Sequence, residues 1–477
     1  PEAGRDLYVH GNLEITADQT AKNIYIEPTA SLTIAKGATL TVTDTLYIRS
    51  RGTQVGQLLN NGTLTLGAGK LLYTHQMAQK NVAEPLAVPF DCTLPKTAGG
   101  VACVPLKTRL QAETGKASGN HVVIKKYNGA TRANGWDGTA AALWDKLSGA
   151  NITLKATEGY EIVSGSAYYR EYLFPLTYDK DATAATTANL TAYKAPNTAP
   201  RNIGWNFLCT PNTSNYSQSI TLSPSDQKYA FIVRYAADGA FITSINMGGL
   251  DIPPFTPFYV QVNGTGENNQ KVVLTYTDGA PAHLRAPVQA EENPTSWASI
   301  TLSDGNAADQ TTLIICNDHQ DGYEVGADCE KMLGTTEVRP QVYTVAVDGL
   351  RAFNALPEAT AATPVAVGYI APKAAELTFS LSEDFPLEKI EHLYLSDYET
   401  GTVTDLISNH YPFFTTAGTF QERFALYVTY RNEVSTEINS EANTADMPRK
   451  VMKDGQLYII VQGRVLDTTG REVSDFE

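Results

Sequence analysis

The chain has 477 residues, of which 42% are hydrophobic, and its formal net charge at pH 7 is −15. This length predicts roughly two to four domains, and the apolar content excludes a wholly disordered chain. The acidic surface repels nucleic-acid phosphates and anionic lipid, and the sequence lacks the run of about 18 apolar residues that a membrane span requires, so we expect neither nucleic-acid binding nor membrane insertion.

Residue types that favour strands and turns dominate the sequence. Tyr (25) outnumbers Phe (15), and 36 Gly and 24 Pro supply turn positions. Tyr and Thr suit half-buried pleated surfaces, while Gly and Pro interrupt regular elements. The predicted fold class is therefore all-β: a short parallel β-solenoid followed by two β-sandwich-like domains and a C-terminal β-hairpin segment.

Residues 1–75 contain short triplets that place two apolar side chains on one face. One series is Leu7–Val9, Ile24–Ile26 and Leu46–Ile48, and a second is Leu13–Ile15, Leu32–Ile34 and Leu64–Leu66. Spacing of about 17–25 residues is typical of solenoid rungs, which bury their apolar faces only when stacked. We predict a short β-helix or β-roll, with the hairpins of an ordinary sandwich as the alternative. The side chains predicted to point inward are Leu13, Ile15, Leu32, Ile34, Leu64 and Leu66.

Residues 76–285 read as strands with short loops and are predicted to form a β-sandwich-like domain. Val122–Ile124 leads into an Asn-Gly turn signal, and Asp238-Gly239 separates two further apolar runs. A short helix is expected around Ala140–Leu147. The Ala- and Thr-rich stretch Asp181–Ala199 is predicted to be a long surface loop.

Residues 286–296 have the composition of a linker, and residues 297–435 are predicted to form a second β-sandwich, with strands every 8–15 residues or so. Residues 450–477 form a C-terminal β segment. Its apolar runs are separated by Asp454-Gly455 and Gln462-Gly463, both suited to tight turns. We predict three antiparallel strands from Val451 to Val473.

Several of these stretches resemble large secreted surface proteins of Bacteroidota. Gly56–Leu64 is similar to the end of their β-helical placeholder region, and Asp454–Ile459 with Thr469–Val473 resembles their C-terminal segment. Further matching motifs are Gly204-Trp205-Asn206, Leu395-Ser396-Asp397-Tyr398, Thr400-Gly401, Asp405-Leu406 and Arg423-Phe424. The resemblance implies an extracellular or outer cell-surface location and a tail related to type IX sorting signals. It implies no catalytic residues.

Five cysteines are too few, and too uneven in number, for a disulfide framework. Cys92 with Cys103, and Cys316 with Cys329, are near enough in sequence for local bridges. Neither pair has the spacing of zinc ligands. Buried free thiols are the favoured interpretation, and the two bridges are the alternative.

The acidic stretch Asn317–Asp328 partly follows the spacing of a calcium loop, with Gly322 at the sixth place. Asp318, Asp321 and Asp328 are the candidate ligands. His319 stands where a carboxylate belongs, and strands rather than helices flank the loop. We therefore expect that the protein requires no cofactor. Calcium is the one cofactor that the pattern allows, and a solvated polar turn is the simpler interpretation of the stretch.

Exposed aromatic rings are the usual platforms for sugars. Tyr168, Tyr169 and Tyr172 cluster in one segment, and Trp136 lies close to the Asn-Gly turn. These four residues are the candidate glycan-binding residues, although alternate tyrosines in a strand also serve as core or edge cover.

No nucleophile elbow or zinc-protease motif occurs in the sequence, and the seven histidines are scattered. Polysaccharide lyases also use β-helices, but residues 1–75 offer few acids and bases for a catalytic groove. The leading hypothesis is a non-enzymatic secreted or cell-surface protein with a structural or adhesive role, whose partners would be glycans or host surface proteins. A glycan-binding protein is the second hypothesis, and a polysaccharide-degrading enzyme is the third.

Overall fold

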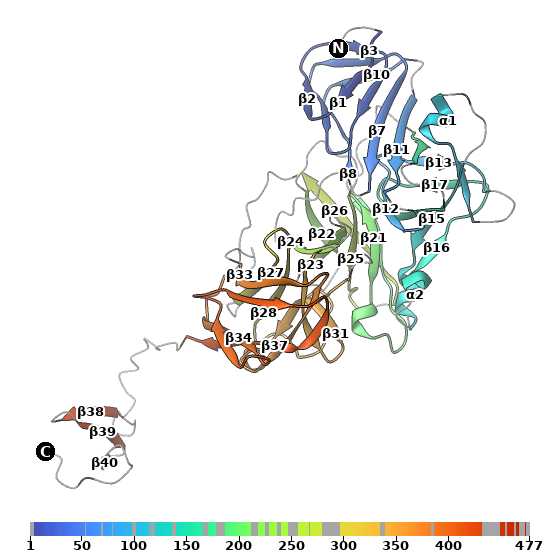
Figure 1. Cartoon of the computed structure of the whole chain (residues 1–477). Coiled ribbons are helices and arrows are strands. Elements are labelled where there is room, and N and C mark those ends of the chain that lie inside the picture. The colour runs from blue at the N-terminus through green and yellow to red at the C-terminus, as the bar shows by residue number, and fades with distance from the viewer. Residues whose placement is uncertain are drawn as a thin grey trace. The chain divides into compact units, whose positions relative to one another are not determined.

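A computed structural model gives the fold of the chain (Figure 1). It describes residues 4–473, apart from 53, 68–69, 79, 98–101, 114, 116–119, 136–139, 166–169, 178–186, 211–217, 225–228, 236–239, 247–255, 267, 279–295, 334–338, 383–385, 432–448, 454–455, 462–463 and 467–472. Two compact units emerge, Pro1–Tyr430 and Arg431–Glu477.

The described chain is nearly all β, which confirms the predicted fold class. Its helices are short: α1 (Arg109–Glu113), α2 (Gly129–Ala133), α3 (Glu358–Ala361), and the 3₁₀ turns η1 (Ala140–Leu143) and η2 (Pro200–Asn202). The helix expected around Ala140–Leu147 is therefore only η1, and Trp144 already begins a strand. Within the described residues, no helix is long and apolar enough to cross a membrane.

The first part of the chain is a parallel β-solenoid with three faces (Figure 1). One face stacks β1 (Leu7–Val9), β4 (Ile24–Ile26), β7 (Thr45–Arg51) and β11 (Lys70–Gln76). The second stacks β2 (Asn12–Ile15), β5 (Ser31–Ile34) and β9 (Gln57–Asn60), and the third stacks β3 (Gln19–Ala21), β6 (Thr39–Val42) and β10 (Thr63–Leu66). The short β8 (Gln54–Val55) folds back against β7. The parallel solenoid predicted from the triplets is confirmed.

The inward face of the solenoid also agrees with the prediction, but one triplet belongs to another face. Leu32 and Ile34 have no exposed surface, and Leu64 is buried too. Leu32 pairs with Leu58, however, whereas Leu64 pairs with Leu40. Both faces carry similar Leu-containing triplets, so spacing alone could not show which triplets stack on one another.

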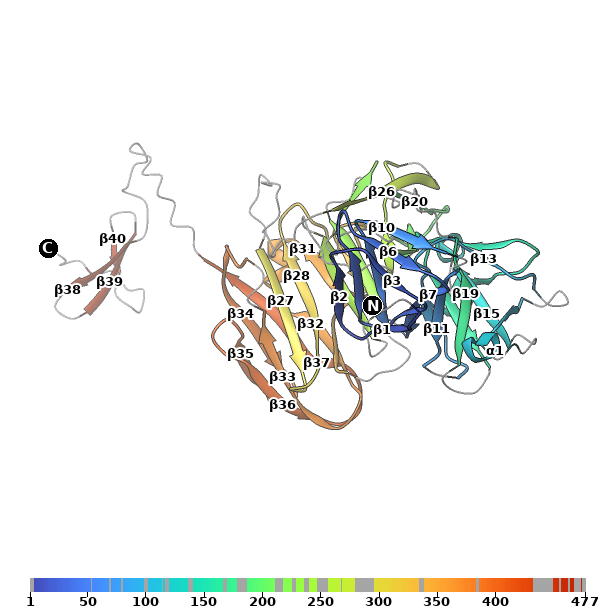
Figure 2. The same cartoon turned by 90° about the horizontal axis from the view of Figure 1, so that it is seen from above.

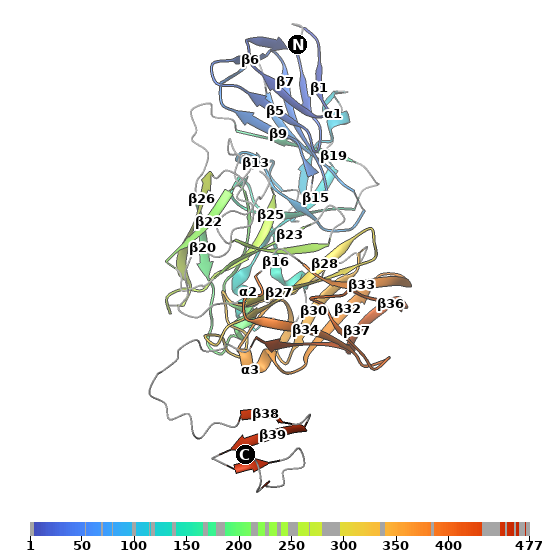
Figure 3. The ribbon, with the colours of Figure 1, turned by 90° about the vertical axis from the view of Figure 1, so that its left-hand side faces the viewer.

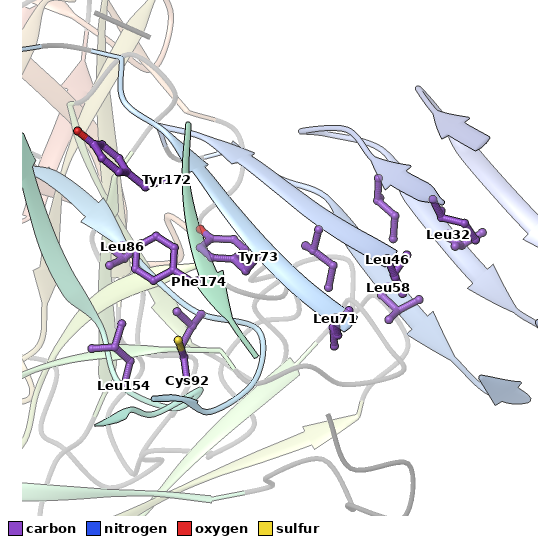
Figure 4. Packing of buried hydrophobic residues seen from close by; sticks show 14 of the residues in the cluster. Leu32, Leu46, Leu58, Leu71, Tyr73, Leu86, Cys92, Leu154, Tyr172 and Phe174 are labelled. Atoms are coloured by element: carbon purple, nitrogen blue, oxygen red, sulfur yellow. The ribbon is translucent and has the colours of Figure 1, made fainter. Parts of the chain in front are cut away.

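The solenoid shares its core with the module that follows it, residues 77–176, here called the adjoining module. The last strand of the solenoid, β11, pairs in parallel with β7 and in antiparallel with β19 (Glu171–Pro175) of the adjoining module. Figure 4 shows the apolar side chains continuing from Leu32 and Leu58 through Tyr73 to Phe174 and Leu154. The remaining strands are β12 (Glu84–Leu86), β13 (Cys92–Leu94), β14 (Val104–Leu106), β15 (Asn120–Tyr127), β16 (Trp144–Lys146), β17 (Ile152–Leu154) and β18 (Tyr160–Ser164).

Residues 187–278 form a sandwich of two sheets, here called the middle sandwich (Figure 3). One sheet has the order β20 (Thr187–Ala192), β26 (Gln270–Asp278), β22 (Gln218–Ser223). The other has the order β21 (Trp205–Cys209), β25 (Pro257–Gln261), β23 (Ala230–Tyr235), β24 (Phe241–Asn246). The segment predicted as one domain, 76–285, thus contains two sets of sheets. The predicted loop Asp181–Ala199 is wrong over β20, where Ala188, Leu190 and Ala192 alternate into the core.

Residues 296–430 form one eleven-stranded sheet that curls round a single core, here called the large-sheet module (Figure 2). Its strands are β27 (Ser296–Ser303), β28 (Ala308–Ile315), β29 (Cys329–Glu330), β30 (Gln341–Ala346), β31 (Gly349–Leu356), β32 (Val365–Ala371), β33 (Ala375–Leu381), β34 (Ile390–Asp397), β35 (Thr402–Asp405), β36 (Tyr411–Thr415) and β37 (Gly418–Tyr430). The order is β35-β34-β37-β32-β30-β31-β28-β27-β33-β36, and β29 adds to β31.

Three modules of the first unit meet in one aromatic cluster, here called the central junction. The adjoining module contributes Tyr127 and Trp144, the middle sandwich contributes Trp205, and the large-sheet module contributes Trp297 and Phe353. The rings meet edge to face or tilted, as for Tyr127 and Tyr259, whose centroids are 5.3 Å apart. Such contacts add to the burial of large apolar surfaces, so the junction holds the three modules together.

The second unit contains three strands, β38 (Arg449–Lys453), β39 (Gln456–Val461) and β40 (Arg464–Leu466). They form an antiparallel sheet in sequence order, with Val451 opposite Tyr458 and Ile460 opposite Val465. The prediction of three antiparallel strands in the tail is confirmed.

Candidate functional site

The predicted sugar-binding tyrosines do not form an exposed platform in the described structure. Tyr172 lies in β19 with no exposed surface, and its hydroxyl shares a 2.7 Å hydrogen bond with Ser164 Oγ. It packs in the core between the solenoid and the adjoining module (Figure 4). Tyr172 therefore has no face to offer a sugar. Tyr168, Tyr169 and Trp136 lie outside the described residues.

Two of the candidate calcium ligands, Asp328 and Asp321, accept hydrogen bonds from different elements of the large-sheet module. Asp328 is buried, and it accepts hydrogen bonds from the amides of Glu324 (2.7 Å) and Ala355 (2.8 Å). Asp321 instead accepts from Thr360 Oγ1 at 2.5 Å. Asp318, Asp321 and Asp328 do not converge, and no cluster of metal-ligating side chains occurs among the residues that the structure describes. The loop is solvated only in part: Asp318 and Asp321 are exposed, whereas His319 and Asp328 are buried.

No disulfide joins any of the five cysteines, all of which lie in the described part of the chain. Cys92, Cys209, Cys316 and Cys329 are buried, and Cys103 is half-buried. Burial raises the pKa of the Cys92 thiol to about 12, with a smaller contribution from the nearby Asp91. The thiolate is the reactive form of cysteine, so this thiol is inert at neutral pH.

One buried cluster has the residue types of a catalytic triad. Ser50 Oγ lies 3.0 Å from His75 Nδ1, and His75 Nε2 lies 3.3 Å from Glu84 Oε2. Sequence reasoning missed it, because the three residues belong to different strands. Ser50 is 1% exposed and His75 is 0% exposed, so no substrate can reach the hydroxyl. The cluster instead links β7, β11 and β12 where the solenoid ends, as satisfied buried polar networks do.

A groove of about 610 Å³ lies on the large-sheet module, where β34 turns away from β37; it is here called the first groove. Asp397 is the last residue of β34 to pair with β37, opposite Phe424. The preceding part of β37 continues beyond that point, with β32 as its neighbour on the other side. The groove is lined by Tyr398, Glu399, Thr419, Phe420, Gln421, Glu422 and Arg423.

Asp397 fixes the turn that forms one wall of the first groove. Its Oδ1 accepts from the amide of Glu399 (2.9 Å), and its own carbonyl accepts from the amide of Gly401 (2.8 Å). Gly401 has φ +72°, a conformation that favours glycine. The amide of Tyr398 donates to the carbonyl of Arg423 at 2.9 Å. The backbone that carries Tyr398 is therefore held at both ends.

Arg423 anchors the same turn from the side of the sheet. It donates to Asp397 Oδ2 from Nη2 at 2.8 Å, and its Nη1 lies 2.7 Å from Glu399. The guanidinium sits 4.9 Å from the ring centroids of both Phe413 and Phe424. Burial acts to raise the pKa of Asp397, but hydrogen bonds from Arg423 and Tyr411 hold that pKa below its ordinary value. The pair is thus charged and fixed in place.

The exposed groups of the first groove differ from those that build it. Tyr398 is 60% exposed, and the Glu399 side chain is 67% exposed. The motif residues Asp397, Thr400, Gly401 and Arg423 could be found from the sequence, and they shape the turn; of these four, Arg423 also lines the groove. The outward direction of Tyr398 follows from the turn, which no periodic pattern predicts. The groove offers an aromatic ring, carboxylates and an amide side by side.

Comparison of this chain with protein-family models, with curated proteins and with solved structures found no match.

Proposed function

We propose that this protein is a non-enzymatic adhesive protein of the outer cell surface, and that its first groove binds a glycan. The observation that carries the proposal is Tyr398, a largely exposed ring on a turn that Asp397 and Arg423 hold rigid. A sugar presents a C–H face that packs on an aromatic ring and hydroxyl groups that bond to planar polar side chains. Gln421 and Glu399 line the same groove and supply such groups.

Rigidity strengthens this interpretation. An aromatic side chain has few rotatable bonds, and the backbone that carries Tyr398 is already held, so little of the protein must be ordered when a ligand arrives. The shared core between the solenoid and the adjoining module, and the central junction beyond it, support the structural part of the role. The cell-surface location is part of the proposal and is supported by the resemblance to secreted surface proteins of Bacteroidota.

The test is a glycan array probed with the purified chain, followed by titration of the best-bound glycan. We expect Tyr398→Ala to weaken binding at least tenfold or so, because stacking is lost, while Tyr398→Phe retains most of it. Tyr8→Ala is the matched control, since Tyr8 is also an exposed tyrosine, at 52%, but lies on the solenoid.

Two results would contradict the proposal: no glycan retained by the parent chain, or equal binding by the Tyr398→Ala and Tyr8→Ala variants. A parallel array of host surface proteins separates glycan binding from recognition of a protein partner. If the chain binds only to the array of host surface proteins, and Tyr398→Ala abolishes that binding, the adhesive role stands and the ligand of the first groove is a protein.

A further inference from the structure

A second groove, of about 430 Å³, lies beside the first on the same unit. One wall is the segment Ala199–Arg201 of the middle sandwich, and the other is the β30–β31 hairpin at Val345–Leu350. Gln421 lines both grooves. The shared residue makes the two grooves neighbours on the surface of the first unit.

The walls of the second groove are held by specific contacts. Arg201 Nη1 donates to the carbonyl of Asp348 at 2.6 Å and so ties the hairpin to the middle sandwich. The Asp348 carboxylate pairs with Arg351 and accepts from the amide of Tyr323 at 3.1 Å. Gly349 has φ +144°, a backbone conformation that favours glycine, and the end of the Arg201 side chain packs close against it.

The strand that connects the two grooves presents polar, exposed side chains. Thr419, Gln421 and Glu422 are exposed in this part of β37, and Val347 stands fully exposed at the tip of the hairpin. Polar groups along the way and an apolar contact at its end suit a chain molecule with hydroxyls and C–H faces. A single sugar ring would use only one end of the surface.

Charge narrows the class of sugar. Glu422 is an exposed carboxylate of the first groove, and Glu399 shares the single Arg423 guanidinium with Asp397, so carboxylates outnumber cations there. The nearby cations are already engaged, Arg423 by Asp397 and Arg201 by the Asp348 carbonyl. An acidic sugar would meet carboxylates of its own sign, whereas a neutral sugar or one with a free amino group would not be repelled.

From these observations we infer that the two grooves form one track for a linear oligosaccharide of neutral or amino-substituted sugars, running from Tyr398 past Gln421 to the β30–β31 hairpin. This inference rests on the proposed glycan binding. It adds the length and the charge of the ligand, neither of which follows from Tyr398 alone.

The experiment titrates the full chain with three oligosaccharide series, each from one to six sugars: cello-oligosaccharides, chitosan oligosaccharides and oligogalacturonides. We expect the affinity for the neutral or the amino series to rise at least tenfold or so between one sugar and the longest, because additional sugars fill the second groove. The acidic series should bind most weakly at every length.

The decisive variant is Val347→Trp, which places a large side chain in the second groove at a residue that does not line the first. It should reduce the affinity for the long oligosaccharides to that for the single sugar, and leave the single-sugar affinity within about twofold. Val403→Trp is the matched control, since Val403 is also an exposed valine of the large-sheet module, outside both grooves.

Three outcomes would each contradict the proposal of one continuous track. They are an affinity that does not depend on oligosaccharide length, tightest binding of the acidic series, and equal effects of the two tryptophan variants. Those outcomes leave the proposed function intact if Tyr398→Ala still abolishes binding. If none of the three series and no other glycan binds, the proposed function fails, and the track fails with it.

Discussion

Where the solenoid meets the adjoining module, one apolar core runs through both, whereas three modules meet at the central junction through aromatic rings with an ion pair packed among them. In the first joint Leu32, Leu46 and Leu71 continue into Leu86 and Phe174, and the ion pair of Arg49 with Glu171 lies outside this apolar cluster. In the second, Arg132 lies 4.7 Å from the ring centroid of Trp205 and pairs with Glu330 of the large-sheet module.

The difference indicates two ways of making a multi-module chain rigid. A shared apolar core is non-directional, and its strength follows the area removed from water. A buried ion pair adds little net stability, because desolvation offsets the attraction, but losing one partner is costly. The first joint should therefore tolerate apolar exchange and reject charge, while the second should be sensitive to which partner is removed.

The largest effect is expected from a charge placed in the solenoid core. Leu32→Asp would bury an unpaired carboxylate in β5, which should lower the free energy of unfolding by about 4 kcal/mol or more. Denaturant unfolding of the purified variant measures this. Thr65→Asp is the control, since Thr65 is an exposed residue of β10, and it should change little. A Leu32→Asp variant as stable as the parent would mean that this face is not the core.

Breaking the ion pair of the central junction should have the next largest effect. Arg132→Met leaves Glu330 beside a buried joint without its cation, and we expect a loss of about 3 kcal/mol. In Arg132→Met/Glu330→Met both charges are gone, so the double variant should be more stable than Arg132→Met. A double-mutant cycle by thermal unfolding measures the coupling. Losses that simply add would show that the two side chains act independently.

The third expected effect is a dependence of stability on pH that arises beside the central junction. Burial raises the pKa of Asp328 in the loop beside the central junction to about 6, although the amides of Glu324 and Ala355 act to lower it. The folded state therefore holds this proton more tightly than the unfolded chain, where an Asp has a pKa near 3.9. The resulting stabilisation is complete below about pH 4 and is lost as the pH rises through about 6.

This contribution should amount to about 2–3 kcal/mol. Asp328→Asn removes the titration, so the difference in stability between parent and variant should shift in the variant's favour from pH 4 to pH 7. Thermal melts of the parent and of Asp328→Asn across that range test it. A parent–variant difference that is constant with pH would contradict the assignment.

Elements with a periodic apolar pattern could be predicted from the sequence, whereas contacts between residues that are distant in the sequence could not. The solenoid and the tail were predicted because their apolar triplets and turn glycines are local signals. β20 was missed because its core residues, Ala188 and Ala192 among them, are small and look like a polar loop. The first groove depends on Asp397 meeting Arg423 across two strands, and that pairing cannot be read from either stretch alone.

The smallest effect is expected at the C-terminal tail. The tail's three strands belong to a compact unit of their own, Arg431–Glu477. Truncation after Ala445 should therefore shift the melting temperature of the first unit by less than about 1 °C. In the native host, the truncated protein should fail to reach the surface if the tail is a sorting signal. A truncated protein that is unstable when purified would show instead that the tail completes the preceding module, and normal stability with normal surface display would exclude both roles.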